Sequence, residues 1–419
     1  GTFNQSGGTL TTGSGGVILR GFSTAGTGTY TLSGGILKSA SAGINLGDQG
    51  PGTWNFTGGT AELGRLIVTT GTPTVNFGGG TLRAMADFIV ANTIPMTLTG
   101  TGGAAKIDTN GRNVTIEGVL SSTGALTKQG NGTLTLTANN TYSGATTISY
   151  GTLALGGASG ALANTPTITI DSNSKLKLDN TSNNLDRVNN ATPIGITGGM
   201  IDFFHPGSAA TNYAESLGAI TVTTGENTIL TSRAASGSTS TLTLANLTRS
   251  DGNLNFSGLG FGPTSDPRNK IAINGGTPNS TFPAWATINH IFPAGLDADK
   301  NVVIAIPGPG YYTDIYARPT ATLADYTIPN NPDAYVRILT NGTRNGSILL
   351  EGYPETHIAN LAMANTDLVG GSKVQMNETA LLTSGILLNS DAQSLTIGEY
   401  SGDGELVTHS DGGTLTLHN

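Results

Sequence analysis

Short runs of alternating apolar and polar residues, separated by glycine-rich corners, recur along this chain. A nine-residue version occurs four times near the start, at residues 2–10, 29–37, 53–61 and 74–82. The first residues of successive copies lie 27, 24 and 21 positions apart (29−2, 53−29 and 74−53). Alternation with a period of two predicts strands that send one set of side chains inward and the other to solvent. A repeat of roughly 20–50 residues is typical of a solenoid, a propeller or an array.

A pair of glycines separates the two runs within each copy. Glycine adopts the positive φ angles and tight bends that other residues resist. Each copy therefore predicts a short strand, a corner and a second strand, which is what one coil of a parallel β-helix needs. The corner positions are Gly7, Gly8, Gly34, Gly35, Gly58, Gly59, Gly79 and Gly80. We predict an all-β fold, a parallel β-helix or β-solenoid.

Composition supports strands and turns rather than helices. The 419 residues include 62 glycines, only 11% are charged, and there is no cysteine. Helix surfaces favour Lys, Glu, Ala, Arg and Leu, and Lys and Glu are scarce here. The net charge of −8 argues against nucleic acid as a partner, because nucleic-acid binding needs a clustered basic face. No apolar run reaches the ~18 residues of a transmembrane helix, so we expect no membrane span in this segment.

The most specific segment lies within residues 121–157. Its residues predict three amphipathic strands with Gly and Asn at the bends, leucines and an isoleucine facing the core, and a tyrosine packed at a corner. The positions that carry the pattern are Gly130, Gly132, Leu134, Leu136, Tyr142, Gly144, Ile148, Gly151, Leu153 and Leu155.

This segment resembles the autotransporter-associated β-strand repeat. The family pattern is L-x-K-x-G-x-G-T-L-x-L, then N-T-Y-x-G-x-T-x-I, then G-T-L-x-L, and residues 126–155 match every lettered position. The resemblance implies a right-handed parallel β-helix, a passenger exported to the bacterial surface. Residues 247–258, 285–289 and 404–407 also resemble parts of the very long repeat proteins of planctomycete-type bacteria. Both chain ends read as repeat sequence, so we expect a piece of a longer, extracellular or cell-surface protein.

The pattern divides the chain into four segments. Residues 1–120 are β-helix coils with Gly-Gly corners, residues 121–260 are β-helix containing the specific repeat, and residues 341–419 are again coils. Residues 261–340 carry ten of the seventeen prolines, together with Tyr311, Tyr312 and Tyr316. Proline donates no ladder hydrogen bond, so we expect this stretch to form irregular coils with stiff loops. Alternatively, it is a protruding module with a possible tyrosine contact region.

Catalytic patterns are weak. Residues 365–367, Asn-Thr-Asp, match one short motif of the polygalacturonases, but the Asp-Asp, Gly-His-Gly and Arg-Ile-Lys partners of that motif are missing. Asp367 is therefore the single named residue of an enzyme hypothesis in which a second carboxylate would be required. We expect no enzyme activity, no cofactor and no metal site, although the acidic turns at 47–50 and 402–405 leave a bound calcium open.

Three functions remain, in this order of preference. The first is a non-enzymatic structural role, as a rigid segment of a surface fibre, stalk or filament. Its partners would be copies of the chain or further repeats of it, stacked end to end. The second is an adhesin passenger that presents loops to a host cell or a surface polysaccharide. The third is a polysaccharide-active β-helix enzyme.

Overall fold

The alternating runs form strands in the computed structural model, which is an all-β parallel β-solenoid of about ten turns. Among the described residues there is no helix, and therefore none that is long and apolar enough to cross a bilayer. The structure describes residues 1–19, 26–48, 50–207, 211–262, 264–283, 285–289, 292–305, 312–316, 327–328, 330–339, 347–351, 355–363, 372–374, 380–383, 386–388 and 395–397.

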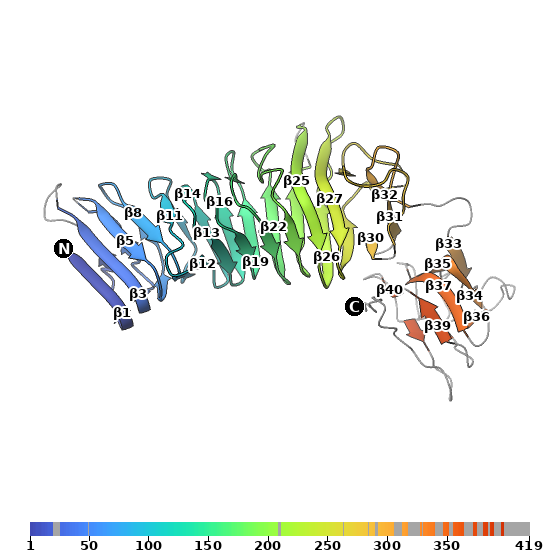
Figure 1. Ribbon diagram of the computed structural model, residues 1–419, viewed down its shortest axis with the longest axis horizontal. Coiled ribbons are helices and arrows are strands. Elements are labelled where there is room, and N and C mark those ends of the chain that lie inside the picture. The colour runs from blue at the N-terminus through green and yellow to red at the C-terminus, as the bar shows by residue number, and fades with distance from the viewer. Residues whose placement is uncertain are drawn as a thin grey trace.

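Each coil contributes strands to up to three faces of a column (Figure 1). The first face contains β1 (Thr2–Thr11), β3 (Gly28–Ser39), β5 (Gly52–Phe56), β8 (Thr74–Phe77), β11 (Met96–Leu98) and β14 (Leu120–Ser121). The second contains β6 (Thr60–Leu63), β9 (Thr81–Ala84), β12 (Ala105–Asp108), β15 (Leu126–Gln129), β18 (Thr146–Ile148), β21 (Ile168–Ile170), β23 (Ile194–Ile196), β25 (Tyr213–Val222), β27 (Ser240–Arg249) and β29 (Lys270–Ile273). The third contains β10 (Phe88–Val90), β13 (Arg112–Ile116), β16 (Gly132–Leu136), β19 (Gly151–Leu155), β22 (Ser174–Asp179), β24 (Met200–Phe204), β26 (Glu226–Thr231), β28 (Asn253–Ser257) and β30 (Ala286–Ile288).

Two smaller sheets complete the coils. The first consists of β2 (Val17–Ile18), β4 (Ile44–Asn45) and β7 (Leu66–Ile67), and the second of β17 (Asn139–Asn140) and β20 (Ala161–Leu162).

The glycine corners connect the first two faces. Strand β3 pairs with β5 through its first half and with β6 through its second half, so the two faces join in one 16-stranded sheet. Gly35 sits at this bend with φ of 77°, a conformation that glycine adopts without steric cost. A Cβ on Gly35 would also collide with the backbone of Gly7 and Gly8 in the coil below. The corner therefore requires glycine both for its backbone angle and for the close stacking of coils.

The register between coils follows the repeat. Thr2 pairs with Thr29, Thr29 with Thr53 and Thr53 with Thr74, so the four copies lie directly on one another, as the sequence pattern predicts. Equivalent polar side chains bond between coils; for example, Asn76 Nδ2 donates to Asn55 Oδ1 at 2.8 Å.

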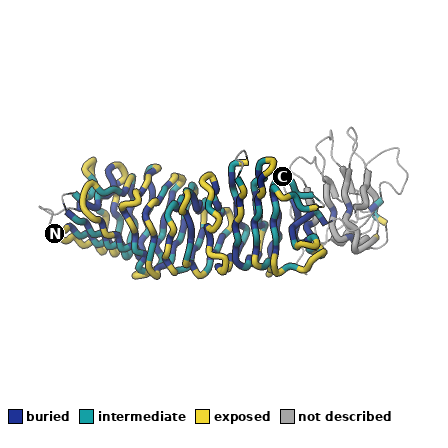
Figure 2. The backbone as a smooth tube through the Cα atoms, turned by 90° about the horizontal axis from the view of Figure 1, so that it is seen from above, coloured by how far each residue is buried: buried dark blue, intermediate teal, exposed yellow. Residues whose placement is uncertain are grey.

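Inward-facing residues form one continuous core along the column. Buried and partly exposed residues alternate in the strands, which gives the banded colouring of Figure 2. Aromatic rings fill the early coils: Trp54 stacks on Phe56 at 4.8 Å, and Phe56 stacks on Phe77 of the next coil at 4.9 Å. The core cluster runs from Leu19 to Val302.

The pairing changes after β30. Strands β31 (Phe292–Leu296) and β32 (Val302–Ile304) pair antiparallel, β31 with β30 and β32 with β31. Further parallel pairs then form two sheets. One contains β33 (Tyr312–Tyr316), β35 (Asn331–Leu339), β37 (Glu355–Met363), β39 (Ala380–Thr383) and β40 (Ile386–Leu388), and the other β34 (Thr327–Ile328), β36 (Ser347–Leu350), β38 (Ser372–Val374) and β41 (Leu395–Ile397). The four-segment division stays a prediction.

Candidate functional site

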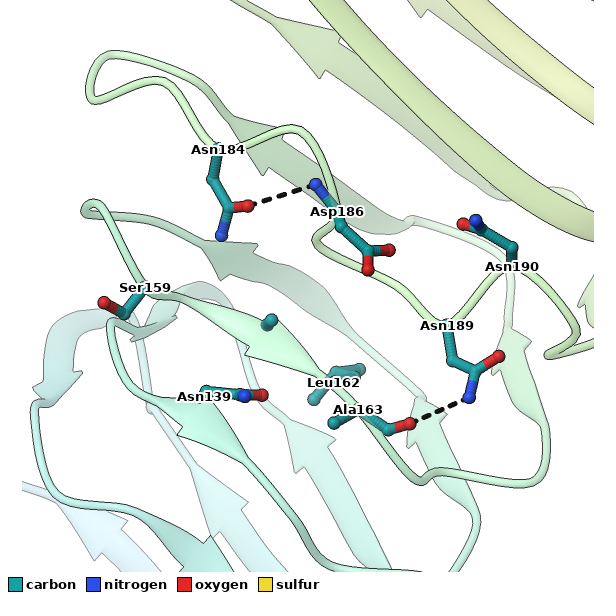
Figure 3. Close-up of a pocket in the computed structure, with 9 residues that line it drawn as sticks. Asn139, Ser159, Leu162, Ala163, Asn184, Asp186, Asn189 and Asn190 are labelled. Carbon is teal, nitrogen blue, oxygen red and sulfur yellow. Dashed lines mark hydrogen bonds between the residues drawn. The ribbon is translucent and has the colours of Figure 1, made fainter.

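A hollow of about 480 Å³ opens on the side of the column beside the two-residue strands β17 and β20. Its floor is Ala161, Leu162 and Ala163. Six polar residues surround this floor: Asn139, Ser159, Asn184, Asp186, Asn189 and Asn190. The side chains shown in Figure 3 come from two loops, one after β19 and one after β22, together with β17 and β20. We call this feature the polar hollow.

Some of these polar groups hold the hollow in shape and others are free. Asn189 Nδ2 donates to Ala163 O at 2.9 Å, which joins the outer loop to the floor strand, and Asn184 Oδ1 accepts from the Asp186 amide at 3.0 Å (Figure 3). Within the described part of the chain, the side chains of Asn139, Asp186 and Asn190 make no hydrogen bond or ion pair. They can therefore turn donors and acceptors toward a ligand.

A buried arginine ties the two walls together. The Arg187 side chain is fully buried. Its Nε donates to Asn180 Oδ1 at 2.7 Å and its Nη2 to Ser182 O at 2.7 Å, both in the loop after β22. Its Nη1 donates to Gly160 O at 2.8 Å and its Nη2 to Gly157 O at 2.9 Å, both in the loop after β19. The guanidinium connects two successive coils, and its positive charge strengthens these hydrogen bonds.

A buried glutamate supports this arginine from the next coil. The Glu215 carboxylate, 1% exposed, accepts from the amides of Arg187 at 3.0 Å and Val188 at 3.1 Å. These bonds replace the backbone partner that an unbroken strand would supply at this point. Burial raises the pKa of Glu215 to about 7, although the two amide bonds and the Arg187 charge favour the ionised form. Burial likewise lowers the pKa of Arg187, while the Glu215 charge opposes this shift.

A second buried cation lies inside the specific repeat. Lys128 Nζ donates to three corner carbonyls, at 2.9 Å to Gln129, 2.6 Å to Gly130 and 2.9 Å to Tyr150. The residue is fully buried, and burial lowers its pKa to about 8. The lysine of the motif therefore satisfies backbone acceptors at a corner where two coils meet.

The repeat positions named from the sequence within residues 126–155 lie in β16, β18 and β19 and in the corners between the strands. Five core positions are fully buried: Leu134, Leu136, Ile148, Leu153 and Leu155. The leucines pair in register between β16 and β19.

The remaining repeat positions lie at the corners. Tyr142 is buried, and its hydroxyl lies 2.7 Å from Thr146 Oγ1. Gly130, Gly132 and Gly151 have φ of 72°, 93° and 72°. A Cβ on Gly144 would collide with the backbone of Gly124.

The other glycine corners behave in two ways. In the first three copies Gly8, Gly35 and Gly59 take positive φ. A Cβ on Gly34 or Gly58 would collide with the carbonyl oxygen of a serine in the coil below. Gly7 has open space around it. The fourth copy differs: Gly79 packs on Gly102, and a Cβ on Gly80 would enter the Phe56 ring.

The tyrosines proposed as contacts contribute little to the described structure. Tyr312 and Tyr316 are the end residues of β33, and their backbones pair with Tyr335 and Leu339. Their side chains, the whole of Tyr311 and the Asp367 of the enzyme hypothesis lie outside the described residues.

Sequence reasoning missed the polar hollow and the ion network behind it. One signal was present: residues 180–190 contain five asparagines and no apolar alternation. An arginine and a glutamate 28 positions apart, close to the coil length of the surrounding region, would have been a second signal. Among the described residues, no three His, Cys, Asp or Glu side chains gather as metal ligands would.

Comparison with known proteins supports the repeat assignment. Residues 126–155 match the passenger-associated-transport-repeat family. A further similarity is to the adhesin BmaC autotransporter of Brucella suis biovar 1 (strain 1330), 38% identical over 117 residues, which is 27% of this chain and 3% of that protein. The match therefore spans a small part of its relative. No solved structure matches the chain. The chain thus combines a parallel β-solenoid with a passenger-associated repeat and has a distant similarity to an autotransporter adhesin.

Proposed function

We propose that this chain is a rigid, non-enzymatic β-solenoid segment of an autotransporter-type passenger at the bacterial surface, and that it presents loops for adhesion to a host cell or a polysaccharide. The observation that carries the proposal is the passenger-associated repeat at residues 126–155, which forms five strands of the column. The similarity to a protein named as an adhesin supports the adhesive role over a purely structural one.

The fold suits presentation at a distance. Coils stack at about 4.8 Å per strand, so the column length grows with the number of coils while the core stays continuous. Loops that leave the column can differ from coil to coil while the strands keep the core continuous.

An attachment assay tests the adhesive role. Beads coated with the chain are expected to attach to host-cell monolayers or polysaccharide-coated surfaces above the level of albumin-coated beads. Replacing Tyr311, Tyr312 and Tyr316 by Ser tests whether the predicted tyrosine region makes the contact. Tyr150→Ser is a matched control, because Tyr150 is 41% exposed on the column itself. Attachment no greater than that of albumin on every surface would contradict the proposal.

A structural role as a column that grows end to end is the second candidate. Strand β1 pairs with β3 on one edge, and no described strand pairs with its other edge. Phe3 at this edge is 52% exposed and packs on Tyr30 at 5.5 Å between ring centres. An exposed strand edge is a template for a further strand. A further coil of the same repeat fits this edge, in line with the wider resemblance to very long planctomycete-type repeat proteins.

Sedimentation tests this second role. The purified chain is expected to associate as its concentration rises, and Phe3→Lys is expected to reduce that association, because lysine on an edge strand opposes pairing. Ile89→Lys, at a residue 60% exposed on the side of the column, is the control. A monomer at all concentrations, or equal association of both variants, would argue against growth through this edge.

The non-enzymatic part has its own test. Incubation with neutral and acidic polysaccharides is expected to release no reducing ends. Any depolymerisation that Asp367→Asn abolishes would restore the enzyme hypothesis.

A further inference from the structure

We propose that the polar hollow binds an uncharged, hydroxyl-rich saccharide segment. This deepens the proposed adhesive function and rests on it, because it names a ligand class and a place on the column for the contact. Four observations carry it: the free polar side chains, their mixed donor and acceptor character, the single carboxylate, and the rigid walls.

The free groups match the hydrogen bonding of sugars. Asn139 and Asn190 each offer an amide donor and an amide acceptor, Ser159 offers a hydroxyl, and Asp186 offers two acceptor oxygens. A saccharide hydroxyl both donates and accepts, so each of these groups can pair with one. The apolar floor at Leu162 can lie against the C–H surface of a sugar ring. The volume of about 480 Å³ falls in the range of small-molecule sites.

The charge decides between classes of glycan. Asp186 is the single ionisable side chain among the lining residues, and the chain carries a net charge of −8. A carboxylate in the site repels sialic acids, uronates and sulfated sugars. The same carboxylate accepts hydrogen bonds from neutral hydroxyls and makes them stronger than neutral pairs.

The walls are fixed before a ligand arrives. Arg187, in the loop after β22, donates to Gly160 O and Gly157 O of the other wall, so two hydrogen bonds hold the walls at a fixed spacing. Its bonds to Asn180 and Ser182 fix the guanidinium within its own loop. Asn189 adds a bond from the outer loop to Ala163 on the floor. A preorganised site loses less conformational freedom on binding, so a ligand that makes few hydrogen bonds can still bind in the hollow. Repeated sugars on a surface and several copies of the chain would add avidity.

Isothermal titration and saturation-transfer NMR test this proposal directly. The probes are maltohexaose, cellohexaose, mannotetraose and chitotetraose as neutral saccharides, and 3′-sialyllactose and tetragalacturonate as acidic ones, all in EDTA. The full chain is expected to bind at least one neutral probe and neither acidic probe.

Two substitutions remove free groups of the hollow without touching its framework. Asp186→Asn and Asn190→Ala are each expected to weaken binding of the neutral probe by about tenfold or more, because each removes one hydrogen bond to the saccharide. Asp251→Asn and Asn113→Ala are matched controls, since both residues are exposed and lie outside the hollow. Far-UV circular dichroism and thermal melts check that all four variants keep the fold.

The outcomes are distinct from those of the attachment assay. Binding of a neutral probe that both hollow variants weaken and both controls retain supports the proposal. Absence of binding to every neutral probe, equal binding by the hollow variants, or preference for an acidic probe overturns it. If bead attachment persists while the hollow binds no saccharide, this inference fails and the adhesive function stands. If the hollow binds a saccharide but the beads do not attach, the saccharide site stands and the adhesive function fails.

Discussion

Replacing Arg187 by Met removes the guanidinium that joins the loops after β19 and β22. Methionine keeps much of the side-chain length and volume but donates no hydrogen bond. Four acceptors lose this donor, but one of them, Asn180 Oδ1, keeps a second donor in the Asn184 amide at 3.3 Å. Two of the lost bonds, to Asn180 Oδ1 and Gly160 O, are buried, and the two to Gly157 O and Ser182 O are partly buried, where water can replace them.

The magnitude follows from these acceptors. A buried group left without a partner costs about 1–3 kcal/mol. Gly160 O is the buried acceptor left in that state, because Asn180 Oδ1 keeps the Asn184 amide. Glu215 also loses a nearby positive charge that favours its ionised form. We expect a local loss of about 1–3 kcal/mol.

Hydrogen exchange is the suitable assay, because a long repeat array need not unfold in one step. In a solenoid each coil contacts mainly its neighbours. Amides in β19, β20, β22 and β24 are therefore expected to lose protection by about one to two orders of magnitude, at about 1.4 kcal/mol per tenfold. Amides in β5 and β8 are expected to keep theirs.

Arg112→Met is the control, because Arg112 is exposed on β13. A loss of stability below about 1 kcal/mol, the range of an ordinary surface ion pair, would refute the conclusion that Arg187 holds the two loops together. An equal loss along the whole column would refute the local, coil-by-coil account of stability.

Three further predictions follow from buried groups. Phe56→Ala, which removes the middle ring of the Trp54–Phe56–Phe77 stack, is expected to cost about 3–5 kcal/mol, seen as exchange loss in β3 to β8 and absent in β26. Lys128→Met removes the amine from three corner carbonyls, of which Gln129 O and Gly130 O keep Thr109 as a donor and Tyr150 O is left without one among the described residues. It is expected to lower the stability by about 1–3 kcal/mol, seen as a lower thermal midpoint, whereas an unchanged midpoint would show that water replaces the amine. For Glu215, the folded pKa of about 7 exceeds the ordinary 4.5, so its contribution to stability is full below pH 4.5 and is lost as the pH rises to 7. Glu215→Gln is expected to remove that decline in denaturant titrations at pH 4.5 to 7, and a parallel pH profile in both proteins would contradict the shift.

The amino-acid sequence determined the column. Thr2, Thr29, Thr53 and Thr74 mark one position in successive coils, and the structure pairs them in that order. The glycine corners and the alternating leucines of residues 126–155 were equally readable. The physical reason is that strand alternation and corner geometry are local properties. Each coil's conformation therefore follows from its own residues, and similar coils stack in register.

The tertiary structure alone decided the polar hollow. Its lining residues span positions 139 to 190, and only the stacking of successive coils brings them together. Arg187, in an asparagine-rich stretch, and Glu215, in β25, look like ordinary charged residues in the sequence, yet both are buried. The Glu215 carboxylate accepts from the amides of Arg187 and Val188, and the Arg187 guanidinium donates to acceptors in two coils. The sequence of a loop without periodicity does not indicate which residues the loop packs against. The polar hollow is therefore recognisable only in the folded chain, where a neighbouring coil supplies its second wall.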